Sequence, residues 1–448
     1  MTKKGINAKI DISQKPPVER ILRPFQEFTK LEASGGILLF LFTIVALVWA
    51  NSPWSDSYFN LWQTKLKIGI GGFLLDKPLI LWINDGLMAM FFFVVGLEIK
   101  REMLVGELSS PKQAALPIAA AIGGMIVPAL LYVALNAGKP GAPGWGIPMA
   151  TDIAFALGAL AILGKRVPIA LKVFLVSLAI VDDIGAVLVI AFFYTSHIYW
   201  SNLLIGAGFL IALMFANRAG VRHPLVYAIL GIGGLWLAFL LSGVHATIAG
   251  VLSALTIPAS TRIGRDEFLE KSRYLLGEFD KAGENDKSVL TSKQQRKAAE
   301  ALEKATELIQ TPLQRLEHDL HPWVTFGVMP IFALSNAGVT FDGSLAKLFT
   351  NPVTLGIVLG LVFGKQIGIT LFSWLAVRVG IATLPSGVNW LKIYGVGWLA
   401  GIGFTMSLFI AGLAFDNVET LSIAKLGILT ASLIAGVGGW MILRKTGT

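Results

Sequence analysis

The stretch IALKVFLVSLAIVDDIGAVLVIAFFYT, residues 169–195, decides the class of fold. Its apolar side chains extend over more than the roughly 20 residues that an α-helix needs to cross the hydrocarbon core of a bilayer. Two adjacent acids, Asp182 and Asp183, nevertheless lie in the middle of the run. Each costs roughly 2.5–3.5 kcal/mol at the centre of a membrane helix. The stretch therefore predicts a membrane-spanning helix that keeps two acids for a reason.

The rest of the chain has the same apolar character. Of its 448 residues, 54% are apolar and 15% are charged, against about 25% charged in an ordinary globular protein. Residues 1–34 and 261–319 together hold 34 of the 65 charged residues, so the remainder cannot form a water-soluble surface. A soluble enzyme and a nucleic-acid-binding protein are excluded, and the net charge of +9 is explained by Lys and Arg at the ends of apolar runs.

We predict an all-α polytopic membrane protein with about twelve spans. The apolar runs lie at 35–50, 83–103, 114–135, 147–164, 169–195, 202–217, 223–241, 244–258, 322–340, 353–378, 393–415 and 422–443. An even number of spans places both termini on one side. If that side is the cytoplasm, its segments hold 30 of the 37 Lys and Arg residues and the opposite loops hold 5. Because Lys and Arg gather on the cytoplasmic side, we expect cytoplasmic termini.

The pattern divides the chain into four parts. These are a cytoplasmic N-terminal segment (1–34), spans one to eight (35–260), a charged cytoplasmic insertion (261–319), and spans nine to twelve with a short tail (320–448). The insertion has apolar residues at near-helical spacing, which predicts that it is partly helical.

A short segment between the first two spans, 64–80, alternates polar and apolar residues on either side of Gly71 and Gly72. This pattern predicts a β-hairpin on the outer face, with an irregular loop as the alternative. An isolated two-stranded hairpin is marginally stable in water, so we expect it to pair with another element.

Four ionisable side chains lie well inside apolar runs: Asp152, Asp182, Asp183 and Lys365. Together they cost on the order of 10 kcal/mol, which makes chance retention a poor explanation. Structural ion pairing could account for one Asp with Lys365. Two carboxylates would still lack a base, and this favours a mobile positive partner, either a proton or a metal cation.

Asp182 and Asp183 cannot serve the same role, because adjacent side chains on an α-helix point about 100° apart. One can face a cation cavity while the other faces a neighbouring helix, where Lys365 is the available intramembrane base. Two carboxylates this close repel each other at low dielectric, so we expect the pair to exchange protons under physiological conditions.

Two runs have the pattern of interrupted helices. In GWGIPMATDIAFALG (144–158), Pro148 shortly precedes Thr151 and Asp152, and YGVGWLAGIGFTMSLF (394–409) contains four glycines. Interrupted helices expose backbone carbonyls and helix ends that can coordinate ions. Close helix packing through small residues is the alternative. The positions favour interruption, since related inverted units at 114–195 and 353–443 would each contain one.

Six motifs resemble the NhaA family of bacterial sodium/proton antiporters over about residues 30–443. They are ATDIAFALG (150–158), VDDIGA (181–186), GVHATIAG (243–250), HPWV (321–324), FGKQIGI (363–369) and GIGFTMSLFI (401–410). Inverted-topology repeats are a known property of this family, so the repeats proposed above are not an independent finding.

The resemblance implies twelve spans with two crossed, discontinuous helices, at Thr151–Asp152 and at 395–407. Asp183 would be the principal ligand of Na⁺ or Li⁺ and Asp182 its partner. Lys365 would pair with Asp182 when no cation is bound, and Thr151 and Asp152 would compensate the facing helix ends. No cofactor is implied beyond the transported Na⁺, Li⁺ and H⁺.

The resemblance also implies a bacterial inner-membrane protein that dimerises through the outer hairpin and serves pH homeostasis and salt tolerance. A cytoplasmic pH-responsive cluster is expected, although the insertion before Glu317 is longer than the connection expected there. The candidates for pH regulation are Glu98, Arg101, Glu102, Glu317, His318, His321 and His245. Ordinary solvated charges at span ends, and a packing role for His245, are the structural alternatives.

We therefore expect an electrogenic exchange of cytoplasmic Na⁺ or Li⁺ for external H⁺, and no enzyme activity. A sodium-coupled solute symporter and a cation channel are the alternatives. The first lacks an evident solute pocket, and the second would show no obligatory counter-flow. An intramembrane aspartyl protease would need two aspartates facing one water, which adjacent residues on one helix do not provide.

Overall fold

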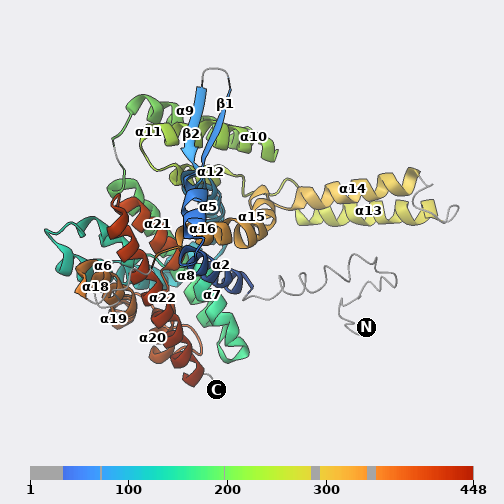
Figure 1. Ribbon diagram of the computed structural model, residues 1–448. Helices are drawn as coiled ribbons and strands as arrows, with labels where there is room; N and C mark the ends of the chain where they lie inside the picture. The colour runs from blue at the N-terminus through green and yellow to red at the C-terminus, as the bar shows by residue number, and fades with distance from the viewer. Residues whose placement is uncertain (1–33, 71–72, 196, 284–292, 341–349, 447–448) are drawn as a thin grey trace.

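The computed structural model describes residues 34–70, 73–195, 197–283, 293–340 and 350–446. Apart from Ser34, the predicted N-terminal segment 1–34 therefore lies outside the described residues. The described chain is mostly helical and contains one two-stranded antiparallel sheet (Figure 1). This agrees with the predicted class of fold.

The elements follow one another with few long connections. Up to residue 256 they are α2 (Ser34–Ala50), α3 (Ser55–Gln63), β1 (Lys65–Ile70), β2 (Phe73–Pro78), α4 (Leu79–Leu81), the π-helical η1 (Trp82–Leu87), α5 (Met88–Val105), the 3₁₀ segment η2 (Glu107–Ser109), α6 (Pro111–Asn136), the 3₁₀ segment η3 (Ala142–Met149), α7 (Ile153–Ile162), the 3₁₀ segment η4 (Gly164–Arg166), α8 (Ile169–Phe193), α9 (Trp200–Arg218), α10 (Pro224–Ala228), the π-helical η5 (Ile229–Trp236), α11 (Leu237–Ser242) and α12 (Ala246–Thr256).

The C-terminal elements run from residue 265 to residue 446. They are α13 (Arg265–Gly283), α14 (Lys293–Ile309), α15 (Pro312–Trp323), η6 (Val324–Val328), α16 (Met329–Asn336), α18 (Pro352–Leu359), η7 (Gly360–Gly364), α19 (Lys365–Arg378), α20 (Trp390–Ala400), α21 (Phe404–Ala414) and α22 (Val418–Thr446).

Two of these C-terminal elements, η6 and η7, are π-helical. Each one joins the α-helices on either side of it without a break in the chain, so α15 to α16 and α18 to α19 are two continuous helices. Lys365 is the first residue after η7. A local change in helical winding therefore immediately precedes the intramembrane base, as π-helical turns often do at functional positions.

Eight helices of the described chain are long and apolar enough to cross a membrane. They are Leu79–Val105, Pro111–Asn136, Ala142–Ile162, Ile169–Phe193, Trp200–Arg218, Pro224–Ser242, Pro352–Arg378 and Val418–Thr446. Two helix pairs, α2 with α3 and α20 with α21, reach this length only together and are bent by 112° and 47°. The chain is therefore an integral membrane protein with eight to ten such spans among its described residues.

The remaining two of the twelve predicted spans have a different form. The run predicted at 244–258 contains α12, an apolar helix of 11 residues. The run predicted at 322–340 forms the end of the continuous helix from Pro312 to Asn336, whose first half is charged. The predicted boundary between residues 319 and 320 thus falls inside α15.

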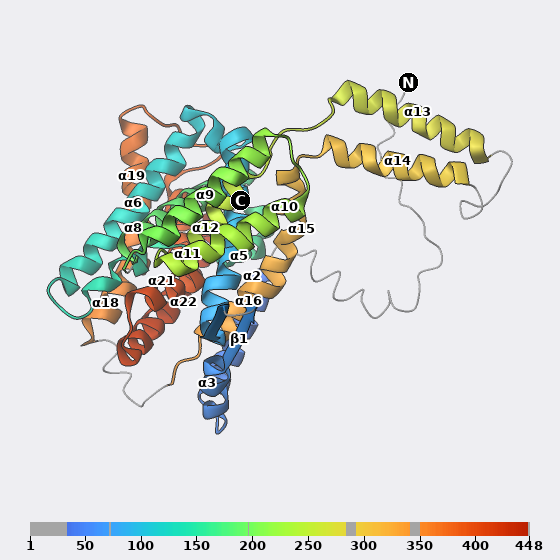
Figure 2. The same ribbon diagram turned by 90° about the horizontal axis from the view of Figure 1, so that it is seen from above.

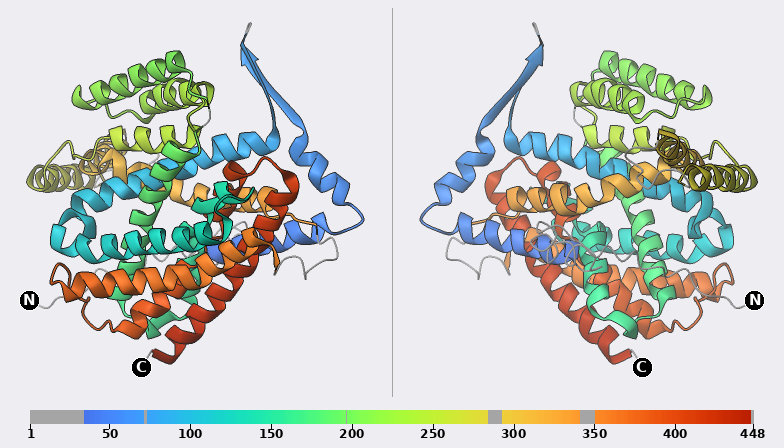
Figure 3. Two further views of the ribbon diagram at one scale, coloured as in Figure 1. Left: turned by 90° about the vertical axis from the view of Figure 1, so that its left-hand side faces the viewer. Right: turned by 90° about the vertical axis from the view of Figure 1, so that its right-hand side faces the viewer.

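The predicted hairpin is confirmed as the pair β1 and β2, with Lys65 opposite Pro78 and Ile70 opposite Phe73. It projects from the helical body as a two-stranded ribbon (Figure 3). Lys67 and Asp76 face each other across the strands, with Nζ 3.5 Å from Oδ2. At its base Lys77 Nζ donates to Asp85 Oδ2 at 3.0 Å, which fixes the hairpin to the start of the second span.

Most of the insertion forms two helices, α13 and α14, which lie side by side and project away from the helical body (Figures 1 and 2). Their base is attached to the body at two points. Arg262 N donates to Leu308 O at 3.0 Å, and Leu313 N donates to Pro258 O at 3.2 Å. Leu313 is itself buried in the core, so α15 is held firmly where the projecting pair begins.

Glycine allows two spans near the centre of the body to approach closely. Gly123 of α6 faces Gly368 of α19, and a Cβ added to either residue would overlap the carbonyl oxygen of the other. At the next position, a Cβ on Gly124 would lie 2.9 Å from Ile369 Cγ1 and 3.7 Å from Lys365 Cδ. Small residues permit such backbone approach in membrane helices. The contact places Lys365 in the interior.

We predict that Gly368→Val destabilises the protein, because the new side chain would have to separate α6 from α19. Overpacking typically costs about 1–3 kcal/mol, and a backbone neighbour cannot yield as a side chain can. Gly208→Val in α9 is the matched control, since a Cβ there meets nothing within 4 Å. Thermal unfolding of the purified variants measures the difference. Equal unfolding temperatures would show that the close approach is dispensable.

Candidate functional site

Two helices are interrupted inside the helical body. The 3₁₀ segment η3 is followed by the non-helical residues 150–152 before α7 begins. Likewise, α20 ends at Ala400 and α21 begins at Phe404, with a bend of 47° between them. Pro148 lacks a backbone N–H and Gly401 and Gly403 weaken helix continuity, which accounts for the interruptions in sequence terms. The ends of four short helices are thus left at membrane depth.

The two interruptions are joined to each other by hydrogen bonds. Asp152 N donates to Ile402 O at 2.7 Å, and Thr151 Oγ1 donates to Ala400 O at 2.8 Å. The hydroxyl of Ser407 donates to Ile147 O at 2.8 Å. Carbonyls at helix ends have no partner within their own helix, and no water is available in the hydrocarbon to satisfy them. Each interrupted segment therefore donates hydrogen bonds to backbone carbonyls of the other segment.

The Asp152 carboxylate binds the beginnings of two half-helices. As the N-cap of α7, its Oδ1 accepts from Phe155 N at 3.0 Å. Its Oδ2 accepts from Thr405 N at 3.1 Å and from Thr405 Oγ1 at 2.5 Å, at the start of α21. A negative charge is stabilised at helix N-termini by free N–H groups and by the helix dipole. This explains how Asp152 is tolerated with 1% of its surface exposed.

Asp182 of α8 and Lys365 of α19 form a buried ion pair. Lys365 Nζ donates to Asp182 Oδ2 at 2.6 Å, and the two side chains are 1% and 2% exposed. The other oxygen of Asp182 is buried beside Thr151 and has no hydrogen bond of normal geometry in the described chain. In this structure Lys365 is therefore paired with Asp182, the partner that the family resemblance implies.

Asp183 is the next residue of α8 after Asp182, and its neighbours differ from those of Asp182. It is 3% exposed, yet it forms no hydrogen bond or ion pair with any residue of the described chain. The charged groups around it are Asp182, Glu98, Asp152 and Lys365, which are three acids and one base. An isolated buried carboxylate is expensive unless a positive partner reaches it. Among the described residues, no three His, Cys, Asp or Glu side chains form a metal-binding group.

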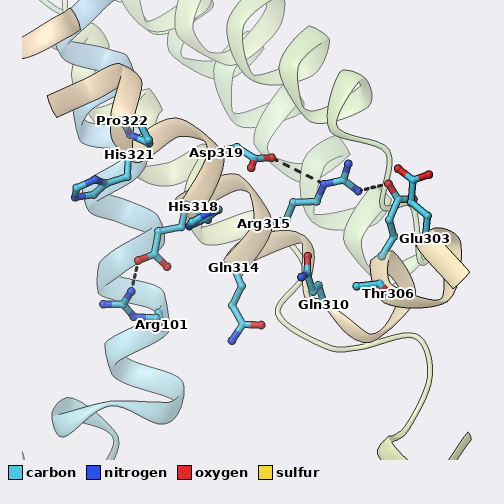
Figure 4. A pocket seen from close by; sticks show the side chains of 12 residues that line it. Arg101, Glu303, Thr306, Gln310, Gln314, Arg315, His318, Asp319, His321 and Pro322 are labelled. Atoms are coloured by element: carbon cyan, nitrogen blue, oxygen red, sulfur yellow. Dashed lines mark hydrogen bonds and ion pairs between the residues drawn. The ribbon is translucent and has the colours of Figure 1, made fainter. Parts of the chain in front are cut away.

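The structure brings six of the predicted pH-regulatory candidates together at one end of α5. Arg101 forms an ion pair with Glu317 of α15, and its Nη2 also lies 3.2 Å from Glu102 Oε1. His318 and His321 line the same pocket as Arg101, which has a volume of about 1080 Å³ (Figure 4). Glu98, one turn earlier on α5, has charged neighbours both in this cluster and at Asp183.

The insertion contributes to this pocket as well, which the sequence did not indicate. Glu303 and Glu307 of α14 line it beside Arg315 of α15 (Figure 4). Arg315 Nη1 lies 2.9 Å from Glu307 Oε1, and its Nε lies 3.9 Å from Asp319 Oδ2. The insertion contains many charged residues of both signs, and its sequence does not indicate which of them form ion pairs.

His245, the seventh candidate, lies apart from this cluster. Its Nδ1 is 2.7 Å from Thr247 Oγ1, its Nε2 is 3.8 Å from Asp85 Oδ1, and its ring packs edge-on against Phe409 at 5.2 Å. Asp85 in turn pairs with Lys77 of the hairpin. Sequence reasoning missed Asp85, because an acid at the first turn of a predicted span is typical of a solvated helix end.

Thr405 is the other residue that sequence reasoning missed. It supplies two of the three hydrogen bonds to the Asp152 carboxylate. The signal was available in part, since Thr405 lies two residues after Gly403, the last glycine of the glycine-rich run. Its partner, however, lies 253 residues away in the sequence.

Comparison with known proteins agrees with this architecture. The family model described as Na⁺/H⁺ antiporter 1 matches residues 26–443. A protein named Na⁺/H⁺ antiporter NhaA from Oleidesulfovibrio alaskensis is 55% identical over 428 residues, which cover 96% of this chain and 95% of that protein. Its namesakes from Koribacter versatilis and Sulfurimonas denitrificans are 50% and 48% identical, covering 95% of this chain and 92% and 96% of their own lengths.

These matches extend over nearly the whole chain and include both interruptions, the aspartate pair and Lys365. The relatives are named as transporters and not as enzymes. The chain therefore belongs to the Na⁺/H⁺ antiporter 1 family, a family of integral membrane proteins that exchange sodium ions for protons.

Proposed function

We propose that this protein exchanges cytoplasmic Na⁺, and also Li⁺, for external H⁺ by competition of the ions for Asp183. The observation that carries the proposal is a buried carboxylate without a hydrogen-bond or ion-pair partner in the described chain, next to the buried pair of Asp182 and Lys365. Either a proton or a small alkali cation would neutralise Asp183. Both cannot occupy it at once.

The ion pair provides a second place for a proton. With Asp183 protonated, Lys365 keeps its own proton and holds Asp182. When Na⁺ reaches Asp183 from the cytoplasm, Asp182 turns toward the cation, and Lys365 then loses its partner and releases its proton. Two protons would thus enter for each Na⁺ that leaves, so one net positive charge moves inward. The membrane potential supplies about 2.3 kcal/mol per 100 mV for that charge.

The interrupted helices support reorientation of the site. We propose that the two interrupted segments cross at Asp152 and Thr151, where the hydrogen bonds between 147–152 and 400–407 join them. A joint made of a few polar contacts can move as a unit more readily than a long apolar interface. Its movement would open Asp183 alternately to the cytoplasm and to the outer face.

We further propose a homodimer in the bacterial inner membrane, with both termini in the cytoplasm. The hairpin supports the dimer, because β1 and β2 pair only with each other in the described chain and no third strand covers either edge. Exposed apolar residues Leu66, Ile68 and Leu74 lie on these strands. Edge-to-edge pairing with the hairpin of a second copy would satisfy the free backbone groups.

The cluster of Arg101, Glu317, His318 and His321 supports regulation by cytoplasmic pH. Histidine is the side chain that ordinarily changes charge between pH 5 and 8. Glu98 lies among charged groups of the cluster and also among those around Asp183. A change of charge in the cluster would therefore alter the electrostatic field at the transport site through Glu98.

Replacing Asp183 by Asn should abolish exchange and leave the protein folded, since the amide is nearly isosteric but has no negative charge to bind a proton or Na⁺. We expect no Na⁺- or Li⁺-dependent proton release in everted vesicles, measured by dequenching of a pH-gradient dye. Asp416→Asn, an exposed acid between α21 and α22, is the matched control and should retain full activity. Exchange that persists in Asp183→Asn would remove the basis of the proposed function.

Replacing Lys365 by Met should leave Asp182 as an unpaired buried charge and destabilise the protein by roughly 3–5 kcal/mol. The double variant Asp182→Asn with Lys365→Met removes both charges and should recover most of that stability without recovering electrogenic exchange. Thermal unfolding and current measurements in proteoliposomes test the two parts. As a control, Arg315→Met breaks a pair whose members are 47% and 48% exposed, and it should cost less than about 1 kcal/mol. A double variant no more stable than Lys365→Met would contradict the pairing argument.

Replacing Glu317 by Gln should shift the pH profile of exchange toward acid. Burial lowers the pKa of His321, which precedes the predicted span 322–340, and the Glu317 carboxylate opposes this by raising it. Without that carboxylate, His321 loses its proton at a lower pH. If activation follows this loss, half-maximal exchange moves toward acid. Glu303→Gln in the same pocket is the control, and an alkaline shift in Glu317→Gln would contradict the assignment.

A further inference from the structure

An apolar groove of about 590 Å³ lies between α2, α7, α22 and the start of α21. Its walls include Phe40, Phe155, Phe404 and Leu433. The hydroxyl of Thr43 donates to Leu39 O at 2.7 Å, and Ser432 Oγ accepts from Phe404 N at 3.1 Å, so these polar groups of the lining are already engaged. The groove therefore offers apolar contact along its length.

The groove is continuous with the surface that faces the bilayer. Ile162 of α7 and Leu433 of α22, which line it, are 63% and 61% exposed. In an integral membrane protein, exposed apolar side chains on spans meet lipid acyl chains and not water. Since the groove opens on this surface, the molecules that reach it first are membrane lipids.

One end of the groove is basic. Trp440 lines that end, and the guanidinium of Arg444 lies 5.0 Å above its ring. Lys445 follows in the last turn of α22. Ile162, on the neighbouring α7, is followed four residues later by Arg166, and both Arg166 and Arg444 are exposed. In the proposed topology this is the cytoplasmic end, where Trp and basic residues meet lipid headgroups.

We propose that this groove is a binding site for one anionic phospholipid. An acyl chain would lie along Phe40, Phe155 and Leu433, and the phosphate would be bound by Arg444 and Lys445. The charge of the phosphate complements the basic end, and the length of apolar wall complements the chain. This site goes beyond ion exchange and does not depend on the proposed transport mechanism.

The position of the groove gives the lipid a structural effect. Phe155 and Phe404 pack edge to face at 5.4 Å, and both line the groove. Phe155 N donates to Asp152 Oδ1, and Thr405, the residue after Phe404, donates to Asp152 Oδ2. An acyl chain against these rings would thus support the two backbone segments that bind Asp152. Bound lipid should stabilise the joint between the interrupted helices.

The thermal unfolding temperature of the full-length protein in detergent tests the site without reference to transport. Phosphatidylglycerol should raise it by several degrees, and by more than phosphatidylcholine with the same chains. Leu433→Trp fills the groove from its exposed side and should lose this rise. Leu204→Trp, at an exposed position of α9 outside the groove, is the matched control and should keep it. An equal response of the two variants would overturn the proposal.

The headgroup contact has its own test. Replacing Arg444 and Lys445 together by Gln should abolish the preference for phosphatidylglycerol while the response to lipid chains remains. Arg378→Gln, a basic residue in the last turn of α19, is the control. Native mass spectrometry should find one phosphatidylglycerol retained by the wild type and the control and lost from the double variant. A wild type that shows no response to either lipid would overturn the proposal, as expected if residues 1–33 or a second copy fill the groove.

Discussion

The structure depends on the cost of placing charge in a medium of low dielectric constant. Its three buried aspartates, Asp152, Asp182 and Asp183, differ in how their charge is compensated. Asp182 is neutralised by the ammonium group of Lys365. Asp152 receives three hydrogen bonds from the beginnings of two half-helices. Asp183 has neither kind of partner in the described chain. Because fixed groups already compensate its two neighbours, Asp183 is the acid to which the proposed exchange assigns the mobile ion.

The spacing of these acids on one rigid helix determines what each of them meets. The rotation of about 100° between adjacent residues lets Asp182 contact α19 while Asp183 lies among the acids of α5 and the first interruption. Glu98 on α5 extends this acidic neighbourhood toward Arg101 and Glu317. The continuous helix from α15 to α16 carries Glu317 from the charged insertion into the body. The charges clustered at Arg101 and Glu317 and the buried acids around Asp183 therefore belong to one connected electrostatic environment.

Much of this arrangement could be predicted from the sequence, because the cost of a misplaced charge is a local property. Asp152, Asp182, Asp183 and Lys365 are conspicuous in apolar runs, and the alternation around Gly71 and Gly72 indicates a hairpin. Which group compensates each charge is not a local property. Thr405 for Asp152, Asp85 for His245 and Glu307 for Arg315 become apparent only when the chain is folded. The length of α15 was missed for a related reason, since a change from charged to apolar residues marks the edge of a span but need not end a helix.

The proposed competition also accounts for exchange without leak. An empty Asp183 is an anion at membrane depth with acidic neighbours, and moving it through the low-dielectric interior is unfavourable. A proton removes that charge and a sodium ion offsets it, so either of them permits the joint at Asp152 to move. The sodium-loaded site has one positive charge fewer than the protonated site, because Lys365 has released its proton. Within the joint, the two hydrogen bonds that Thr405 donates to Asp152 go to a carboxylate, and such bonds are about twice as strong as neutral ones, which would keep the two half-helices together as the site turns. A carrier that can reorient only when Asp183 holds a proton or a sodium ion must return with one of the two ions, and this proposed requirement would couple an outward sodium flux to an inward proton flux.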